Sequence, residues 1–331
     1  MKTIVKQLPK VELHLHLDGS VRVSTVAELL NISYEEAYSQ MVCDKNTHSL
    51  TDYLKKFELP VRVMQTKENL KRITKELLED LKEEHVIYVE LRFAPLLHTK
   101  EGLSQKEVVE AIIEEIKEVT GITCNLILCC TRDNLENEKN LETIEVAKKF
   151  LNHGVVALDL AGDESKYPTN LFQKLFEKAK KLGIPYTIHA GEASSYRSIL
   201  EALRLGAVRI GHGISSIQNK KLMNVLKENE ILLEICPQSN VDTNIVVEKK
   251  EHPIKQLFSN MFISVNTDNR TVSNITLTEE YEDLMKVLDF TVEDIKTCNL
   301  NAIKCSFLKE EEKEQFRKQI EEGYCDTTYR S

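Results

Sequence analysis

Short apolar runs alternate with longer stretches of helical periodicity along most of this chain. Eight runs have the length of β-strands: Val11–Leu17, Val86–Phe93, Ile122–Cys130, Val155–Leu160, Pro185–His189, Val208–Gly211, Ile231–Ile235 and Phe262–Asn266. Strands that alternate with helices form parallel sheets, and eight of them are the number that closes into a barrel. We therefore predict an α/β fold, a (β/α)₈ or TIM barrel.

The stretches between these runs carry signals of helix starts. Three pairs have the spacing of helix N-termini: Ser33 with Glu36, Ser104 with Glu107, and Thr291 with Asp294. The segment Val21–Glu84 breaks the simple alternation, because it holds several helical patterns between the first two predicted strands. We expect these extra helices to form a lid over the barrel mouth.

The composition fits one globular unit. Hydrophobic residues make up 41% and charged residues 29%, the balance of a folded domain with a sizeable core. We find no linker and predict a single domain over residues 1–331. The net charge of −9 argues against a nucleic-acid partner, since binding to phosphates depends on Lys and Arg clusters.

The sequence also argues against secretion and membrane insertion. Met1–Lys10 lacks the apolar segment of a signal peptide. The longest apolar stretch, Ile122–Cys130, is far shorter than the ~20 residues that a membrane span needs. Eight cysteines without regular spacing are typical of reduced thiols, so we expect a cytoplasmic protein.

Two histidines alternate with leucines in the first predicted strand. Successive strand side chains point to opposite faces, so His14 and His16 share one face while Leu13, Leu15 and Leu17 share the other. In a barrel the imidazoles would face the interior, where two of them make a partial site for a divalent transition metal. Polar residues on an exposed strand edge are the alternative.

Polar side chains also end three other predicted strands. His189 closes the fifth, His212 follows the sixth and Asp268 follows the eighth. The active sites of α/β barrels lie at the carboxyl ends of the strands, so these residues are expected to converge. Histidines and a carboxylate suit zinc, although each residue alone could be a satisfied buried polar group.

Six segments around these residues resemble those of the adenosine deaminases, a family within the metal-dependent amidohydrolase barrels. They are Pro9–Ser20, Leu160–Glu164, Ile188–Glu192, Arg209–Gly213, Cys236–Asn240 and Asn266–Asp268. The resemblance runs through nearly the whole chain, and Ser49–Gln65 resembles part of that family's substrate lid. It implies a hydrolase of purine salvage with one Zn²⁺ per subunit, whose small-molecule substrate is a purine nucleoside. Adenosine, and with it 2′-deoxyadenosine, would lose its amino group as ammonia.

The resemblance assigns the metal to His14, His16, His189 and Asp268. Zinc can lower the pKa of a coordinated water to about 7, which supplies the nucleophile that this chemistry needs. Asp268 would also accept the water proton. His212 would orient the attacking water, with a further metal ligand or a core histidine as the alternatives.

The resemblance gives Glu192 the role of general acid. It lies three residues after His189, where its side chain could reach a bound base. Protonating a ring nitrogen makes the ring carbon electrophilic, a role that suits a carboxyl with a raised pKa. An acid that merely stabilises a helix N-terminus is the alternative.

Substrate contacts follow from the same resemblance. Asp18 would accept a hydrogen bond from a ribose hydroxyl, His16 would border the substrate, and the Gly162 N–H would meet a ring nitrogen. For Gly162 an ordinary strand-to-loop glycine is the alternative. Many relatives carry a second aspartate after the metal-binding one, which bonds the imidazole-side nitrogen of the base, whereas this chain has Asn269. An amide donates without needing protonation, so the contact can survive.

Other functions stay open at this point. They are an adenine deaminase, a deaminase of a larger adenosine-like nucleoside, and a purine-binding relative that has lost catalysis. The zinc deaminases that act on nucleic-acid strands are excluded, because no Cys-x-x-Cys occurs in the chain.

The remaining charged residues and histidines suggest structural roles. Glu12, Glu90 and Arg92 fall on interior-facing strand positions, where buried charges must be paired, so we predict an internal ion network. The other histidines without a partner pattern are expected to be structural or surface residues: His48, His85, His153 and His252.

Overall fold

The computed structural model describes residues 2–44, 47–133 and 138–325. Its eight strands are β1 (Lys10–His16), β2 (Val86–Phe93), β3 (Thr123–Thr131), β4 (Val155–Ala161), β5 (Thr187–Ala190), β6 (Arg209–His212), β7 (Leu232–Ile235) and β8 (Ile263–Val265). Every predicted strand is present, with bounds that differ by two residues or fewer.

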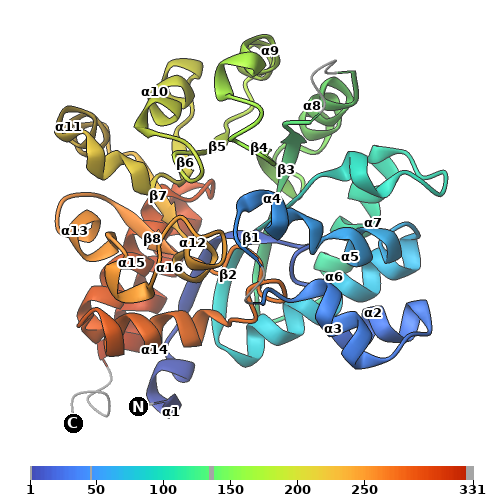
Figure 1. The fold of residues 1–331 in the computed structure, drawn as a ribbon, viewed down its shortest axis with the longest axis horizontal. Coiled ribbons are helices and arrows are strands. Elements are labelled where there is room, and N and C mark those ends of the chain that lie inside the picture. The colour runs from blue at the N-terminus through green and yellow to red at the C-terminus, as the bar shows by residue number, and fades with distance from the viewer. Residues whose placement is uncertain (1, 45–46, 134–137, 326–331) are drawn as a thin grey trace.

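The strands pair in chain order and all pairs are parallel. They form two four-stranded halves, β1 to β4 and β5 to β8. Parallel bridges join the halves at both seams, from Leu158 to Tyr186 and from Leu15 to Asp268. Figure 1 shows the strands at the centre with helices around them. The predicted (β/α)₈ barrel is confirmed.

Helices that follow the strands cover the outside of the barrel (Figure 1). They are α7 (Gln105–Glu118), α8 (Glu138–Phe150), α9 (Gln173–Lys181), α10 (Tyr196–Leu205), α11 (Lys220–Glu228), α13 (Ile254–Phe258), α14 (Leu277–Val287), α15 (Val292–Cys305) and α16 (Glu310–Cys325). The predicted helix starts at Ser104 and Thr291 are confirmed: both residues are N-caps, and each forms a capping box with the acidic residue three positions later. None of the helices in the described ranges is long and apolar enough to cross a membrane.

The long segment between β1 and β2 is helical, as predicted. It contains α2 (Val23–Leu30), α3 (Tyr34–Met41), α4 (Leu50–Lys55), α5 (Glu58–Val63) and α6 (Lys67–Glu83). The short helix α4 lies in front of the centre of the strand ring (Figure 1), and its Tyr53 is 1% exposed. This is the position that a lid requires. A further helix, α1 (Lys2–Gln7), precedes β1, and α12 (Pro237–Asp242) follows β7.

The two faces of β1 have opposite chemistry. Leu13, Leu15 and Leu17 belong to the main apolar core, whereas His14 and His16 belong to the polar barrel interior, where their rings lie 5.4 Å apart. Burial of each leucine contributes about 1.5–3 kcal/mol. The leucines therefore fix which face of β1 turns inward, and with it the direction of the histidines.

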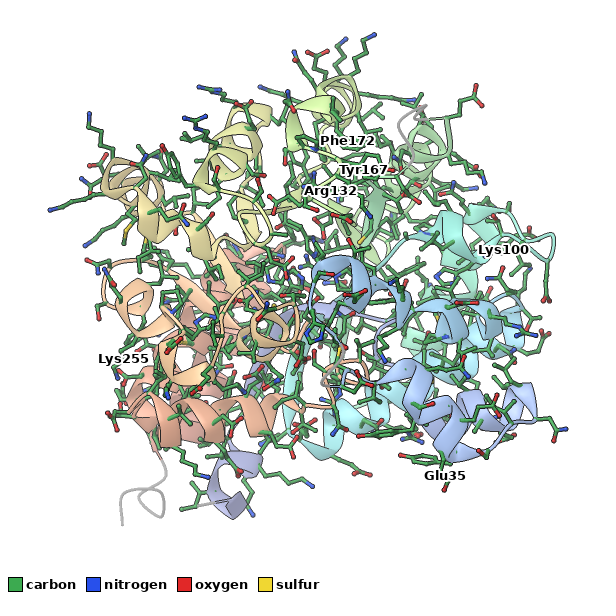
Figure 2. The ribbon with its side chains drawn as sticks, viewed as in Figure 1. Glu35, Lys100, Arg132, Tyr167, Phe172 and Lys255 are labelled. Carbon is green, nitrogen blue, oxygen red and sulfur yellow. The ribbon has the colours of Figure 1, made fainter. Side chains whose placement is uncertain are left out.

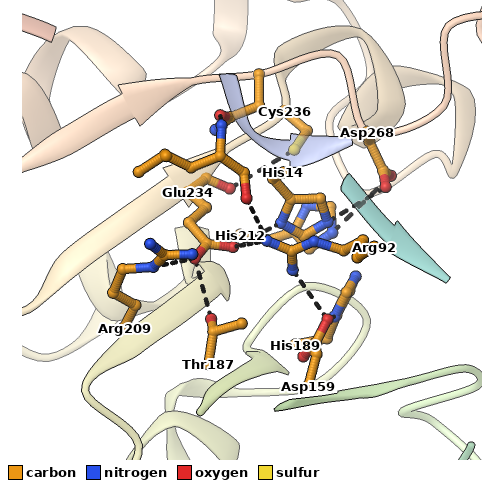
Figure 3. A network of polar contacts seen from close by, with 12 residues as sticks. His14, Arg92, Asp159, Thr187, His189, Arg209, His212, Glu234, Cys236 and Asp268 are labelled. Carbon is orange, nitrogen blue, oxygen red and sulfur yellow. Dashed lines mark hydrogen bonds and ion pairs between the residues drawn. The ribbon is translucent and has the colours of Figure 1, made fainter. Parts of the chain in front are cut away.

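The charged residues of the barrel interior form ion pairs between strands. Arg92 of β2 contacts Asp159 of β4 at 2.9 Å and Glu234 of β7 at 2.8 Å. Arg209 of β6 contacts Glu90 and Glu234, each at 2.7 Å. All five side chains are buried, and Figure 3 shows most of this network. The predicted internal network is confirmed for Glu90 and Arg92.

Glu12 lies outside this network. Its carboxyl accepts hydrogen bonds from the N–H and the hydroxyl of Thr267, at 2.8 and 2.5 Å. Burial raises the pKa of Glu12 to about 7. Hydrogen bonds, together with this weakened acidity, take the place of the close ion pair that we predicted for it.

Replacing Arg209 with methionine should destabilise the barrel strongly, because Glu90 and Glu234 would lose a buried partner. The expected loss in the free energy of unfolding is about 3–5 kcal/mol, measured by urea denaturation. The matched control is Arg204→Met on α10, whose side chain is 70% exposed and pairs with Glu201. That change should cost less than about 1 kcal/mol. Equal losses in the two variants would contradict a structural role for the buried network.

Candidate metal centre and active site

A cavity of about 500 Å³ lies at the carboxyl ends of the strands, beneath the lid. The predicted site residues that line it are His16, Asp18, Gly162, His189, Glu192, His212, Asp268 and Asn269. Leu50, Thr51, Tyr53, Leu54 and Phe57 line it from the lid segment. Of the predicted set, only His14 is not part of the lining, and it lies beneath, fully buried.

Two of the site residues, at or just after the ends of their strands, have an uncommon backbone conformation. His212 ends β6 with a φ of 59° and Asp268 follows β8 with a φ of 62°, both in the left-handed region. This region costs a residue with a side chain about 1–3 kcal/mol, and such residues cluster at functional sites. Two hydrogen bonds to β1 hold Asp268, whose N–H donates to His14 O and whose carbonyl accepts from His16 N–H.

Three imidazole nitrogens and one carboxylate oxygen converge at the base of the cavity. The Nε2 atoms of His14 and His16 each lie 3.3 Å from Asp268 Oδ1, and His16 Nε2 lies 3.3 Å from His189 Nε2. All four ligand atoms are within 4.8 Å of one another. A tetrahedral ion with bonds of about 2.0–2.1 Å holds its ligand atoms about 3.3 Å apart. The spacing therefore fits a divalent transition metal.

Two of these atoms have no hydrogen-bond partner in the described part of the chain. They are His14 Nε2 and Asp268 Oδ1, and both are buried. A buried polar atom without a partner costs about 1–3 kcal/mol. A bound cation would satisfy both atoms at once.

The outward nitrogens of two histidines meet carboxylates of the internal network. His14 Nδ1 lies 2.9 Å from Glu234 Oε2, and His189 Nδ1 lies 2.8 Å from Asp159 Oδ2. Metal-ligating histidines commonly donate their second ring N–H to a carboxylate, which fixes the tautomer and the ring orientation. Because Arg92 contacts both carboxylates, one guanidinium ties together the supports of two candidate ligands (Figure 3).

The pKa shifts of three of the four candidate ligands, His16, His189 and Asp268, suit metal binding. Burial lowers the pKa of His16 well below its ordinary value and lowers that of His189, so both rings are neutral. Burial would do the same for His14, but the neighbouring carboxylates of Asp268 and Glu234 raise its pKa, and a cation bound at Nε2 would have to displace a proton there. For Asp268, the close approach of His14 outweighs burial and holds the pKa well below its ordinary range.

A second group of potential ligands overlaps the first. It combines His14 and Asp268 with His212 and Cys236. Burial raises the pKa of the Cys236 thiol well above its ordinary value, and a thiol must be deprotonated to bind a metal. His212 Nε2 is also 4.0 Å from Asp268, looser than the contacts of His16. The group with His16 and His189 is therefore the better site.

Glu192 and His212 border the metal group. Glu192 Oε2 lies 3.6 Å from His212 Nε2, and burial, followed by the charge of Asp268, raises the pKa of Glu192 well above its ordinary value. Asn240 holds the other side of the His212 ring, with its Nδ2 3.2 Å from His212 Nδ1. His252 in turn contacts Asn240 Oδ1 at 3.1 Å.

The sequence analysis did not predict that Asn240 and His252 hold the ring of His212 in place. Asn240 lies at the end of a segment that carries the family resemblance, so this motif could have drawn attention to it. His252 is 3% exposed, which agrees with a structural role, but no spacing pattern in the sequence connects it to His212.

The substrate-contacting candidates lie at the cavity wall. Burial raises the pKa of Asp18 to about 7. Gly162 takes a φ of 112°, a conformation that favours glycine. Asn269 Nδ2 donates to Tyr53 Oη at 3.0 Å, and that hydroxyl lies 2.9 Å from Ser273 Oγ. Asn269, which stands where many relatives have an aspartate, thus contacts the lid directly.

A (β/α)₈ barrel with four potential metal ligands at the carboxyl ends of its strands has the arrangement of a metal-dependent enzyme. The family model described as Adenosine deaminase matches residues 9–323. The chain belongs to this family.

Comparison with known proteins gives similarity over nearly the full length. An adenosine deaminase of Clostridium acetobutylicum is 44% identical, over 97% of this chain and 99% of the relative. An adenine deaminase from Arthrobacter aurescens has a TM-score of 0.86 at 26% identity, over 95% of this chain and 98% of that chain. An arabidopsis N6-mAMP deaminase has a TM-score of 0.86 at 28% identity, over 97% and 100%.

We propose that His14, His16, His189 and Asp268 bind the metal. The variants His16→Ala and His189→Ala should then purify with little metal, whereas Cys236→Ala should keep a full complement. Metal content per chain, measured by mass spectrometry of the elements, tests this directly. Loss of metal from Cys236→Ala together with retention in His16→Ala would instead support the alternative group.

Proposed function

We propose that this chain, a metal-dependent hydrolytic deaminase, converts adenosine and 2′-deoxyadenosine to their inosine products and ammonia, with one zinc ion per chain. The observation that carries the proposal is the three-histidine and one-carboxylate group beside a buried glutamate. The family membership and the 44% identical adenosine deaminase of Clostridium acetobutylicum support it.

His14, His16, His189 and Asp268 would hold the ion, and their three nitrogen donors and one oxygen donor suit zinc. A catalytic water would then need a further coordination position beside these four. When bound, zinc supplies Lewis acidity that lowers the pKa of water to about 7. Asp268 would take up the proton of the attacking water, the role that the family resemblance gives it. Its Oδ2 already accepts from Ser239 Oγ at 2.6 Å, so the orientation of this carboxylate is fixed before substrate binds.

The two remaining roles, orienting the attacking water and donating a proton to the base, fall to His212 and Glu192. His212 orients the attacking water, and Asn240 keeps its ring in place. Burial raises the pKa of Glu192 well above its ordinary value, which favours the protonated form that a general acid needs. Glu192 donates that proton to a ring nitrogen, and water then adds to the adjacent carbon before ammonia leaves.

The cavity wall supplies the contacts to the substrate. Asp18 accepts a hydrogen bond from a ribose hydroxyl, and the Gly162 N–H donates to another ring nitrogen. His16 borders the base, and the Asn269 amide donates to the imidazole side of the ring. Gly162 is suited to this task because its lack of a Cβ permits close approach of the backbone.

A nucleoside is a better substrate for this cavity than a nucleotide. The two lysines at the cavity wall already have carboxylate partners, Lys55 with Asp52 at 2.8 Å and Lys166 with Asp163 at 3.1 Å. A 5′-phosphate would have to compete for them. Identity to the adenosine deaminase of Clostridium acetobutylicum, at 44%, also exceeds identity to the adenine and N6-mAMP deaminases, at 26 and 28%.

Ultraviolet absorbance separates these substrates. The zinc-loaded protein should convert adenosine and 2′-deoxyadenosine rapidly, with kcat/KM at least about 100-fold above that for adenine or N6-methyl-AMP. Adenine lacks the ribose and its polar contacts, and the extra groups of N6-methyl-AMP would crowd the cavity. Faster conversion of adenine than of adenosine would overturn the substrate assignment. No turnover of any of the four substrates, with zinc bound, would favour a purine-binding relative without catalysis.

Replacing Glu192 with glutamine should leave zinc content unchanged while kcat for adenosine falls about 10²–10⁴-fold, since the amide cannot deliver a proton. Glu118→Gln, at the exposed end of α7, is the matched control and should behave as the parent does. Near-parental turnover by Glu192→Gln would rule out its role as general acid.

A further inference from the structure

The segment after β5 carries two residues of the proposed site on irregular backbone. His189 lies within β5, and Glu192 lies three residues later, where the chain bends toward α10. The Glu192 carboxyl is weakly held by hydrogen bonds, because its Oε1 has no hydrogen-bond partner in the described residues. Its Oε2 lies 3.6 Å from His212. The position of this carboxyl therefore depends on its backbone.

Glu164 holds that backbone. It lies on the loop after β4, and its side chain is buried at 3% exposure. Its Oε1 accepts from the N–H of Gly191 at 2.7 Å, and its Oε2 accepts from the N–H of Glu192 at 3.1 Å. Two hydrogen bonds from one carboxylate to successive N–H groups fix both the position and the direction of a peptide segment. Hydrogen bonds to a charged acceptor are about twice as strong as neutral ones.

Arg132, which follows β3, is positively charged and binds the same segment through a backbone carbonyl. Its Nη2 donates to the carbonyl of His189 at 2.6 Å, and its Nη1 donates to Tyr167 O at 2.7 Å. Figure 2 shows Arg132, Tyr167 and Phe172 close together, and the guanidinium lies 5.9 Å from the Phe172 ring. Oppositely charged side chains from two neighbouring loops thus bind the backbone that carries His189 and Glu192.

The segment has little room to relax elsewhere. Gly191 takes a φ of 70°, and a Cβ there would lie 2.5 Å from Ser215 Oγ and 2.6 Å from Ile199. The turn is therefore packed against α10 on one side and held by Glu164 on the other. A small shift of this turn would move Glu192 relative to a bound base.

We propose that Glu164 is a positioning residue, which holds the turn at Gly191 so that the Glu192 carboxyl meets the substrate ring. This inference rests on the proposed function. The charge of Glu164 acts in the same direction, since burial, Asp268 and Glu164 in that order raise the pKa of Glu192, while Arg132 opposes them. His212 completes the set of titratable groups around this carboxyl.

The test is a double-mutant cycle on the zinc-loaded full chain with adenosine. Glu164→Gln keeps the shape, but its amide nitrogen cannot accept from a backbone N–H. We expect kcat to fall about 10–100-fold with KM changed by less than about threefold, because a misplaced proton donor affects chemistry rather than binding. Zinc content and thermal unfolding should remain close to those of the parent.

The double variant Glu164→Gln, Glu192→Gln distinguishes positioning from a general structural effect. If Glu164 acts through Glu192, the double variant should be no slower than Glu192→Gln alone, within about threefold. The control is Glu107→Gln on α7, an exposed carboxylate that also accepts a backbone N–H, from Ser104, and it should match the parent. If Glu164→Gln does not fold, the same cycle is run with Glu164→Asp.

Two results would overturn the inference while leaving the function intact. One is parental kcat in Glu164→Gln, and the other is multiplication of the two losses in the double variant. Inactivity of the parent chain on adenosine would overturn the proposed function and this inference together.

Discussion

The buried guanidinium of Arg92 is the interaction on which the site depends. A charge taken this far from water must be neutralised, and Arg92 has Asp159 and Glu234 within 2.9 Å. Those same carboxylates meet the outward nitrogens of His189 and His14. The groups that compensate a buried charge therefore also orient two of the four potential metal ligands, and the polar core of the barrel and the metal site form one structure.

Two constraints converge on the candidate ligands from opposite directions. Below them, the network fixes the rings of His14 and His189. Above them, unusual backbone angles at the strand ends aim His212 and Asp268 inward. Neither constraint is sufficient alone, because an imidazole can rotate on a fixed backbone and a fixed ring needs its strand in register. The β1 leucines supply that register, since a slip by one residue would bury the histidines among the outer helices.

The sequence predicted the elements that depend on local pattern. The eight strands follow from apolar runs, and the direction of His14 and His16 follows from their alternation with leucines. The partners of these histidines could not be predicted in the same way. Asp159 lies 30 residues from His189 and 67 from Arg92 in the sequence. Glu234 lies 142 residues from Arg92 and 220 from His14, and only the ring closure brings these groups together. Glu164 acts on backbone N–H groups, for which side-chain spacing carries no signal.

The lid completes the electrostatics of the site. Helix α4 is held on one side by Thr51, which donates to Asp163 Oδ2 at 2.7 Å, and on the other by Tyr53 with Ser273 and Asn269. These contacts anchor it to the loops after β4 and β8, on opposite sides of the ring. Burial is the largest cause of the raised pKa of both Glu192 and Asp18. The lid segment lines the cavity, so the covered barrel favours the protonated form of Glu192 through burial, and the charges of Asp268 and Glu164 act in the same direction.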